Sequence, residues 1–284
     1  MIYYIENDYV KVGVKSDGAE LTSFVSKENN FEYLWQGNPD VWYGQSPVLF
    51  PIIGRVLDDV YYLDGKEYTM PKHGLFRKRE AELVEITETS MTFMEKADDE
   101  TRKVFPFEFR VYVKFTLDGR KLICTFDVVN DSDDTMYFSI GGHPGFNCEI
   151  NDYILFEKNE TLETVSIDAE CLRTGNTIPV LNDSNKLIIT KDIFNNDALI
   201  FSNMKSSYLT LASDNHSRTV KFDFSDCSYL GIWAKPAAPY VCIEPWWGVN
   251  DSHERKADIS QKDAIIALDS GKKFECHWSA EISL

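Results

Sequence analysis

Two residues of this sequence have the surroundings that acid–base chemistry requires. Glu244 ends the apolar run Tyr240–Ile243, and a carboxylate buried there costs free energy unless it is paired or functional. Burial raises the pKa of such a group, as suits a base working near neutral pH. His143 stands among glycines in the segment 141–145, which are expected to let the backbone adopt unusual angles and approach a ligand closely. A glutamate capped by backbone amides and a structural loop histidine are the alternatives.

Three further segments interrupt the regular pattern of the chain. The apolar run 46–54 ends in Arg55, whose fork of donors can bind hydroxyls or an anion in a cleft, or simply reach solvent. The segment 71–79 concentrates positive charge around His73, although a solvated basic loop with a structural histidine would look the same. Trp246 and Trp247 follow Glu244 closely, and either one is expected to stack on a sugar ring or to fill the core.

These residues need a scaffold, and the hydrophobic pattern predicts one made of strands. Apolar residues alternate from Phe107 to Leu117 and again from Leu122 to Val128, on both sides of Asp118-Gly119. A period of two around Asp-Gly is a strong hairpin signal. The segment 274–282 alternates in the same way, and turns are expected at Asp17-Gly18 and Asp64-Gly65.

Helical patterns are rare in the sequence. Residues 97–104 can form a short helix that ends before Pro106, and the segment 260–268 is ambiguous. Many strands with few helices between them favour an antiparallel arrangement over parallel βαβ units. We therefore expect an all-β protein, a large antiparallel β-sandwich, with residues 1–284 forming a single domain.

The composition excludes several kinds of partner. A net charge of −17 repels nucleic acid and anionic membrane surfaces. The first dozen residues contain no signal-peptide core, and no apolar run approaches the ~20 residues of a membrane span. The six cysteines form no CxxC pair and no zinc-ligand spacing. A cytoplasmic location, reduced cysteines and no metal are expected.

Six segments, in order, carry a resemblance to a known family. They are FPIIGR, KHGLFR, VFPFEF, GGHPGFN, NDALIF and CIEPWWG, all between residues 46 and 248. Together they resemble the aldose 1-epimerase (galactose mutarotase-like) family, and most closely its bacterial LacX-type branch. The resemblance implies the large β-sandwich of that family, the galactose mutarotase-like supersandwich, with a saddle-shaped sugar site.

The resemblance also implies roles for individual residues. His143 matches the general acid that protonates the ring oxygen, and Glu244 matches the general base for the anomeric hydroxyl. His73 and Arg55 match residues that hold sugar oxygens and stabilise the open form. Asp197, which would otherwise be a turn residue before a strand, matches a substrate-binding carboxylate. In this scheme the acid and the base act from opposite sides of the hemiacetal.

Arg77 also matches a substrate-binding position, and one departure from the family pattern affects the substrate. Many members that handle neutral sugars have a stretch close to Asn-His-x-Tyr-Phe-Asn, where this chain has Gly-His-Pro-Gly-Phe-Asn at residues 142–147. The segment resembles the more divergent branch that includes hexose-6-phosphate epimerases. Galactose specificity is therefore not carried over.

The expected function is a sugar 1-epimerase that needs no cofactor and acts, as a monomer or homodimer, on a sugar or sugar phosphate. Three alternatives stay open. Positive charge on Arg55, Arg77, Lys78 and Arg79 would suit a hexose-6-phosphate 1-epimerase. A non-catalytic carbohydrate-binding protein would need no His–Glu pair. A glycoside hydrolase would use two carboxylates, for which Glu244 and Asp197 are available.

Overall fold

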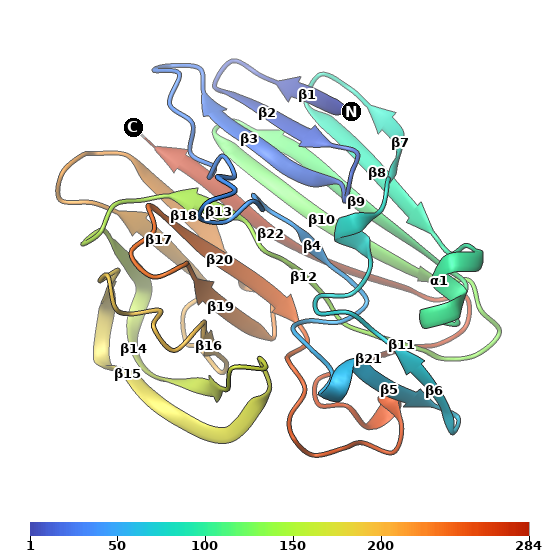
Figure 1. The fold of residues 1–284 in the computed structure, drawn as a ribbon. Helices are drawn as coiled ribbons and strands as arrows, with labels where there is room; N and C mark the ends of the chain where they lie inside the picture. Colours follow the sequence, from blue (N-terminus) through green and yellow to red (C-terminus); the bar gives the residue numbers. More distant parts are fainter. Residues whose placement is uncertain (284) are drawn as a thin grey trace.

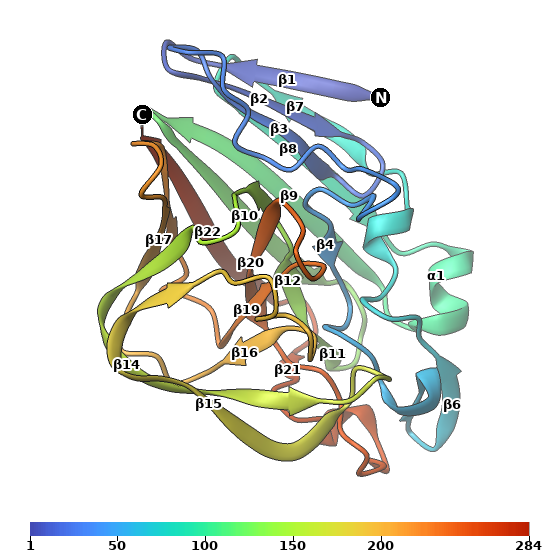
Figure 2. The same ribbon diagram turned by 60° about the vertical axis from the view of Figure 1, so that its left-hand side comes forward.

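The computed structural model describes residues 1–283 and is built almost entirely of strands. Within these residues there is a single α-helix, α1 (Asp99–Val104), and every strand pair in the sheets is antiparallel. The expected all-β antiparallel sandwich is thus confirmed. Figures 1 and 2 show two large sheets face to face, with smaller sheets at the top and bottom of the molecule.

The largest sheet has nine strands in the spatial order β15-β14-β17-β18-β22-β10-β9-β8-β7. In chain order these strands are β7 (Glu82–Ile86), β8 (Ser90–Lys96), β9 (Phe109–Asp118), β10 (Lys121–Asn130), β14 (Tyr153–Ile167), β15 (Arg173–Ile188), β17 (Tyr208–Ala212), β18 (Thr219–Asp223) and β22 (Lys273–Ser283). The long β14–β15 hairpin curls away from the rest of this sheet and forms one wall of the functional cleft described below (Figure 2).

A six-stranded sheet packs on the concave side of the large one. Its order is β16-β19-β20-β12-β4, with β13 also paired to β20. The strands are β4 (Val48–Leu49), β12 (Ile140–Gly142), β13 (Gly145–Asn147), β16 (Leu199–Phe201), β19 (Tyr229–Trp233) and β20 (Tyr240–Trp247). Aromatic contacts join the two layers, among them Phe126 on Trp247 with ring centroids 6.2 Å apart. All eight residues of β20 are buried, because this strand has neighbours on both edges and both faces.

The remaining elements close the ends of the sandwich. A three-stranded sheet covers one end, and two strand pairs, β5–β6 and β11–β21, lie at the other (Figure 1). These elements are β1 (Ile2–Glu6), β2 (Val10–Lys15), β3 (Glu20–Ser26), β5 (Val60–Leu63), β6 (Lys66–Thr69), β11 (Met136–Phe138), β21 (Ile266–Leu268) and the short 3₁₀ turns η1 (Leu57–Asp59), η2 (Phe76–Lys78) and η3 (Ile259–Gln261).

Several of these elements lie where the local sequence patterns predict them. The hairpin around Asp118-Gly119 is confirmed, since β9 and β10 pair with Asp118 opposite Lys121. The alternation of 274–282 is confirmed by β22, and the helix predicted at 97–104 is α1, capped by Asp98. The ambiguous segment 260–268 contains part of η3 and then β21.

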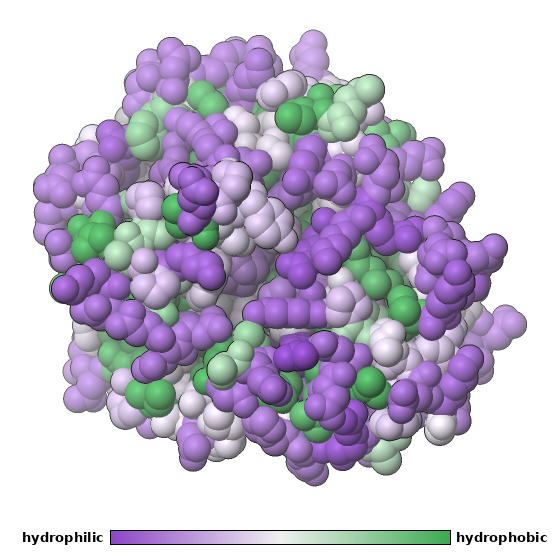
Figure 3. Space-filling view, in the orientation of Figure 1, coloured by the Kyte–Doolittle hydropathy of each residue, from purple (hydrophilic) through white to green (hydrophobic). Residues whose placement is uncertain are grey.

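Apolar side chains form the core and hydrophilic side chains cover most of the visible surface, as expected of this composition. One hydrophobic core runs from Ile5 to Ile282 through both large sheets. Hydrophilic side chains cover most of the face seen in Figure 3, with apolar side chains in small separate groups. All six cysteines are free. Among residues 1–283 no helix is long and apolar enough to cross a membrane.

Candidate active site

The register of the six-stranded sheet brings the two acid–base candidates together. Strands β12 and β13 both pair with β20, so that Gly141 lies opposite Trp246 and Gly145 lies opposite Cys242. The residue midway between the two glycines is His143, and the residue midway along the facing stretch of β20 is Glu244. The same register therefore places the imidazole beside the carboxyl group, although 101 positions separate them in the sequence.

The glycines around His143 serve packing rather than unusual backbone angles. Gly141, Gly142 and Gly145 all lack the positive φ values found at other glycines of the chain. A Cβ on Gly142 would lie 2.9 Å from Nε1 of Trp278, and one on Gly145 would lie 3.0 Å from the ring of Trp42. The expectation that these glycines adopt special conformations is wrong. They let β12 and β13 pass close to large aromatic rings.

His143 and Glu244 lie at the base of a large open cleft. Its volume is about 1520 Å³, and its walls come from the β14–β15 hairpin, the loop before η2 and the ends of β19 and β20. Nε2 of His143 is 3.2 Å from Oε2 of Glu244, and both side chains are buried. A sugar ring cannot fit between groups in contact, so the expectation that they act from opposite sides of the hemiacetal is wrong for this geometry.

Burial controls the protonation of this pair. It lowers the pKa of His143 to about 3 and raises the pKa of Glu244 well above its usual range, because a charge on either group loses its hydration. Burial thus favours a neutral imidazole beside a protonated carboxyl group. Moving that proton to the imidazole gives the imidazolium and carboxylate that the sequence-based mechanism uses, with the same number of protons on the pair.

His73 reaches the cleft because its loop is fastened to the turn after β4. Its backbone N–H donates to the carbonyl of Gly54 at 2.7 Å, and its Nδ1 accepts from the N–H of Gly54 at 3.2 Å. Nε2 is then the protonated nitrogen and a donor toward the cleft. The ring of His73 meets that of His143 edge-on at 5.9 Å, and desolvation lowers the pKa of His73 well below its usual value.

The arginines differ from what the sequence suggested. Arg55 does not line the cleft, because Asp59 holds its guanidinium by two bonds of 2.6 and 2.8 Å. Arg79 is likewise bound by carboxylates, those of Glu95 and Asp98, away from the cleft. Of the three, only Arg77 lines the cleft, where it donates to the carbonyl of Lys72 at 2.9 Å.

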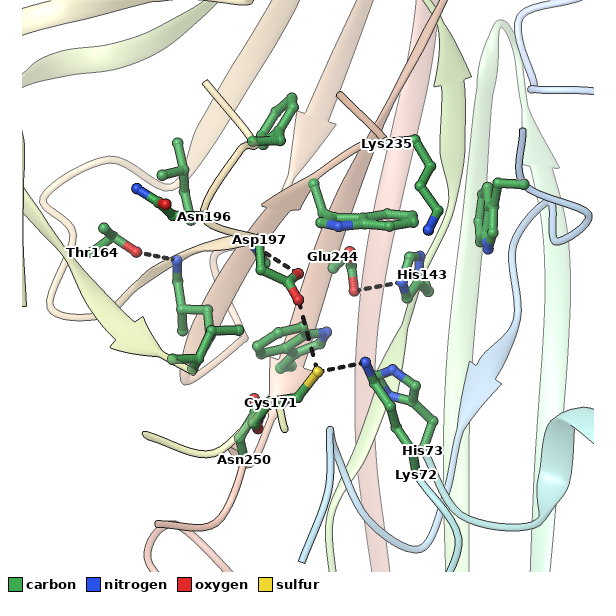
Figure 4. Close-up of a pocket in the computed structure, with 18 of the residues that line it drawn as sticks. Lys72, His73, His143, Thr164, Cys171, Asn196, Asp197, Lys235, Glu244 and Asn250 are labelled. Carbon is green, nitrogen blue, oxygen red and sulfur yellow. Dashed lines mark hydrogen bonds and ion pairs between the residues drawn. The ribbon is translucent and has the colours of Figure 1, made fainter. Parts of the chain in front are cut away.

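Asp197 lies where both interpretations of the sequence placed it, in the turn before β16 and in the cleft. Its φ of 71° is held by a bond from the N–H of Ala198 to its own Oδ1 at 2.8 Å. The other oxygen is 3.7 Å from Sγ of Cys171, which in turn is 2.8 Å from Nζ of Lys72. Figure 4 shows this chain of contacts beside Glu244.

Trp246 forms part of the cleft floor but is not an exposed stacking platform. It is 3% exposed and packs in a small cluster that includes Ile53. Trp42 and Trp233 are half-buried and flank His143, with ring centroids at 5.1 and 5.6 Å. These two rings, which the sequence reasoning missed, present more surface to a sugar.

The structure also brings lysines into the cleft that were not predicted as site residues. Lys72 precedes His73, and Lys235 lies in the turn between β19 and β20, with its amino end directed toward His143 in Figure 4. The position of Lys72 beside a candidate histidine was a usable signal. Nothing local distinguishes Lys235, since it comes to the site only through the β19–β20 pairing.

The sequence of this chain is similar to those of known proteins. Residues 1–257 match the family model for aldose 1-epimerase. The chain is 33% identical to the chromosomal protein LacX of Lactococcus lactis subsp. lactis, over 96% of this chain and 97% of that protein.

Solved structures with the same fold superpose on the whole of this chain. A galactose mutarotase related enzyme from Lactobacillus acidophilus superposes with a TM-score of 0.95 at 34% identity, covering 100% of this chain and 98% of that one. A galactose mutarotase-like protein from Lactobacillus casei gives a TM-score of 0.95 at 31% identity, with 100% of both chains covered. The family match, the close relatives and the shared fold show that this chain belongs to the aldose 1-epimerase family.

Proposed function

We propose that this protein is a sugar 1-epimerase, a mutarotase that interconverts the α and β anomers of an aldohexose. The observation that supports the proposal most is the buried contact of His143 with Glu244 at the base of an open cleft. Ring opening requires one proton to leave the anomeric hydroxyl and one to reach the ring oxygen. Both oxygens are attached to C1, so two proton-transfer groups in contact can reach both from one side of the sugar.

The proposed reaction keeps the roles assigned from the sequence. A sugar bound over the pair stabilises its charged form, because its hydroxyls donate hydrogen bonds to the Glu244 carboxylate. Glu244 takes the proton of the C1 hydroxyl while the imidazolium of His143 protonates the ring oxygen, and the C1–O5 bond breaks. Rotation about C1–C2 exposes the other face of the aldehyde. Closure of the ring reverses both proton transfers, and each positioned transfer accelerates the reaction roughly 10²–10⁴-fold.

The remaining cleft residues suit the binding of a sugar. In this proposal His73 donates from Nε2 to a sugar oxygen, Asp197 accepts from a hydroxyl, and Arg77 binds at the rim. Trp42 and Trp233 cover an apolar ring face. Arg55 could bind a sugar oxygen only if its guanidinium first released the carboxylate of Asp59.

The test is anomer exchange measured by NMR on freshly dissolved α-glucose and α-galactose, on both 6-phosphates, and without enzyme. We expect acceleration well above the spontaneous rate for at least one sugar, and no release of nitrophenol from aryl glycosides. Binding without acceleration would favour a carbohydrate-binding protein, and nitrophenol release would favour a glycoside hydrolase.

A hexose-6-phosphate 1-epimerase is the second candidate, and one observation favours it. Besides Lys15, which is paired with Glu20, four cationic residues line the cleft: Lys72, Arg77, Lys78 and Lys235. Within residues 1–283 none of them pairs with a carboxylate, whereas Arg55 and Arg79 outside the cleft do. In a chain of net charge −17, unpaired cations gathered in one cleft suit an anionic substituent on the sugar.

A further inference from the structure

A buried lysine lies behind the cleft and has no part in the chemistry described above. Lys262 follows η3, is 5% exposed, and within residues 1–283 is the only buried lysine or arginine. Its amino group donates to the carbonyl of Val249 and, at 3.5 Å, to that of Asp263. A cation held mainly by carbonyl groups costs free energy to bury. A lysine buried at this cost is expected to stabilise the backbone segment whose carbonyl groups it binds.

The carbonyls belong to the segment that directly follows β20. Lys262 binds the carbonyl of Val249, and Nε of Arg173 donates to the carbonyl of Asn250 at 2.7 Å. The backbone N–H of Arg173 donates to the carbonyl of Asp251 at 2.9 Å. Three consecutive peptide carbonyls are thus held by two cationic residues, one of them buried.

These bonds from Lys262 and Arg173 to the backbone fix the position of the Asn250 side chain, which lines the cleft. Its Nδ2 donates to the carbonyl of Cys171 at 2.8 Å, while its Oδ1 is buried and has no partner among residues 1–283. Gly54 fits against it so closely that a Cβ there would lie 2.3 Å from Nδ2. Figure 4 shows Asn250 at the edge of the site, beside Cys171. A held carboxamide with a spare acceptor suits a sugar hydroxyl.

We propose that Lys262 is a positioning residue of this cleft: by holding the carbonyl of Val249, it keeps the Asn250 carboxamide in place to accept a hydrogen bond from a substrate hydroxyl. The inference rests on the proposed epimerase function. Burial lowers the pKa of Lys262 to about 8, with Asp251 and Asp263 opposing the shift and Arg173 adding to it. The ammonium form therefore still dominates at pH 7.

The test is a double-mutant cycle on the full chain with Lys262→Met and Asn250→Ala, measured by NMR anomer exchange. Each single variant should raise KM by about three- to tenfold, the size of one lost hydrogen bond, with kcat within about twofold of the original. Because Lys262 acts through Asn250, the double variant should be no worse than Asn250→Ala alone. Lys103→Met, at an exposed lysine of α1 paired with Glu100, is the control and should leave KM unchanged.

Additive effects in the cycle, or an unchanged KM in Lys262→Met, would overturn the inference. If Lys262→Met does not fold, Arg173→Met removes the neighbouring bond to the Asn250 carbonyl and should produce the same change in KM, also non-additive with Asn250→Ala. Absence of acceleration by the original protein would instead refute the proposed function. The same cycle can then be read from tryptophan fluorescence titrations with galactose and galactose 6-phosphate.

Discussion

Glu244 on β20 and His143 between β12 and β13 lie directly opposite each other, with Oε2 and Nε2 3.2 Å apart. Both side chains are buried, at 1% and 8% exposure, yet both border an open cleft. Because burial lowers the pKa of His143 and raises that of Glu244, the pair favours a single proton, carried by the carboxyl group.

Removal of either group should abolish most of the catalysis. We expect His143→Asn and Glu244→Gln each to lower kcat/KM by roughly 10²–10⁴-fold, since each positioned proton transfer contributes about that much. The double variant should be little worse than either single one, because the pair acts as a unit. NMR anomer exchange measures the rates, and His277→Asn, at an exposed histidine, is the control. Full activity in either single variant would refute the assignment.

The dependence of kcat/KM on pH should be bell-shaped and unusually broad. The active pair carries one proton. On the acid side it gains a second, which the lowered pKa of His143, about 3, delays until well below the usual histidine value of about 6.5. On the alkaline side the pair loses its proton only far above the usual range of a glutamate, because burial raises the pKa of Glu244.

The profile is read from initial rates, with circular dichroism to confirm that the protein stays folded at each pH. The limbs belong to the coupled pair rather than to single residues. An acid limb centred near pH 6.5 would contradict the prediction, since it would indicate a histidine in ordinary contact with water.

The two half-buried rings beside His143 should contribute to sugar binding. Trp42→Ala and Trp233→Ala are each expected to raise KM by about three- to tenfold, as loss of an aromatic contact does, with a smaller effect on kcat. Trp247→Phe is the control, because Trp247 lies outside the cleft and bonds to the carbonyl of Asp226. An unchanged KM in both alanine variants would show that the sugar ring lies elsewhere.

The unpaired lysines should decide between a free and a phosphorylated sugar. If the substrate is a hexose 6-phosphate, Lys72→Met and Lys235→Met should each lower kcat/KM for it by about tenfold or more, the cost of one charge-assisted hydrogen bond. The same variants should change the rate on the free hexose by less than about twofold. Lys78→Met tests in the same way a third lysine that lines this cleft. Equal effects on both sugars would rule out a phosphate contact at these lysines.

The local features of the fold could be predicted from the sequence because their causes are local. Alternation around Asp118-Gly119 specifies both the strands and the turn, and β9 and β10 pair as that pattern requires. The burial of Glu244 also followed from its own surroundings, since an apolar run of that length forms a central strand. The glycine-rich segment pointed to His143, which does line the cleft. The glycines themselves allow close packing and do not adopt the unusual backbone angles expected of them.

The composition of the cleft was decided by the tertiary structure. Contact between His143 and Glu244 depends on the register of two short strands on β20, a non-local pairing that no segment encodes by itself. Arg55 is bound by Asp59, four residues away, whereas Lys235 has no such partner in the described part of the chain and extends toward the site (Figure 4). Sequence determined which side chains could do chemistry here. The three-dimensional packing determined which of them lose water and meet, because desolvation and contact depend on neighbours that are distant in the chain.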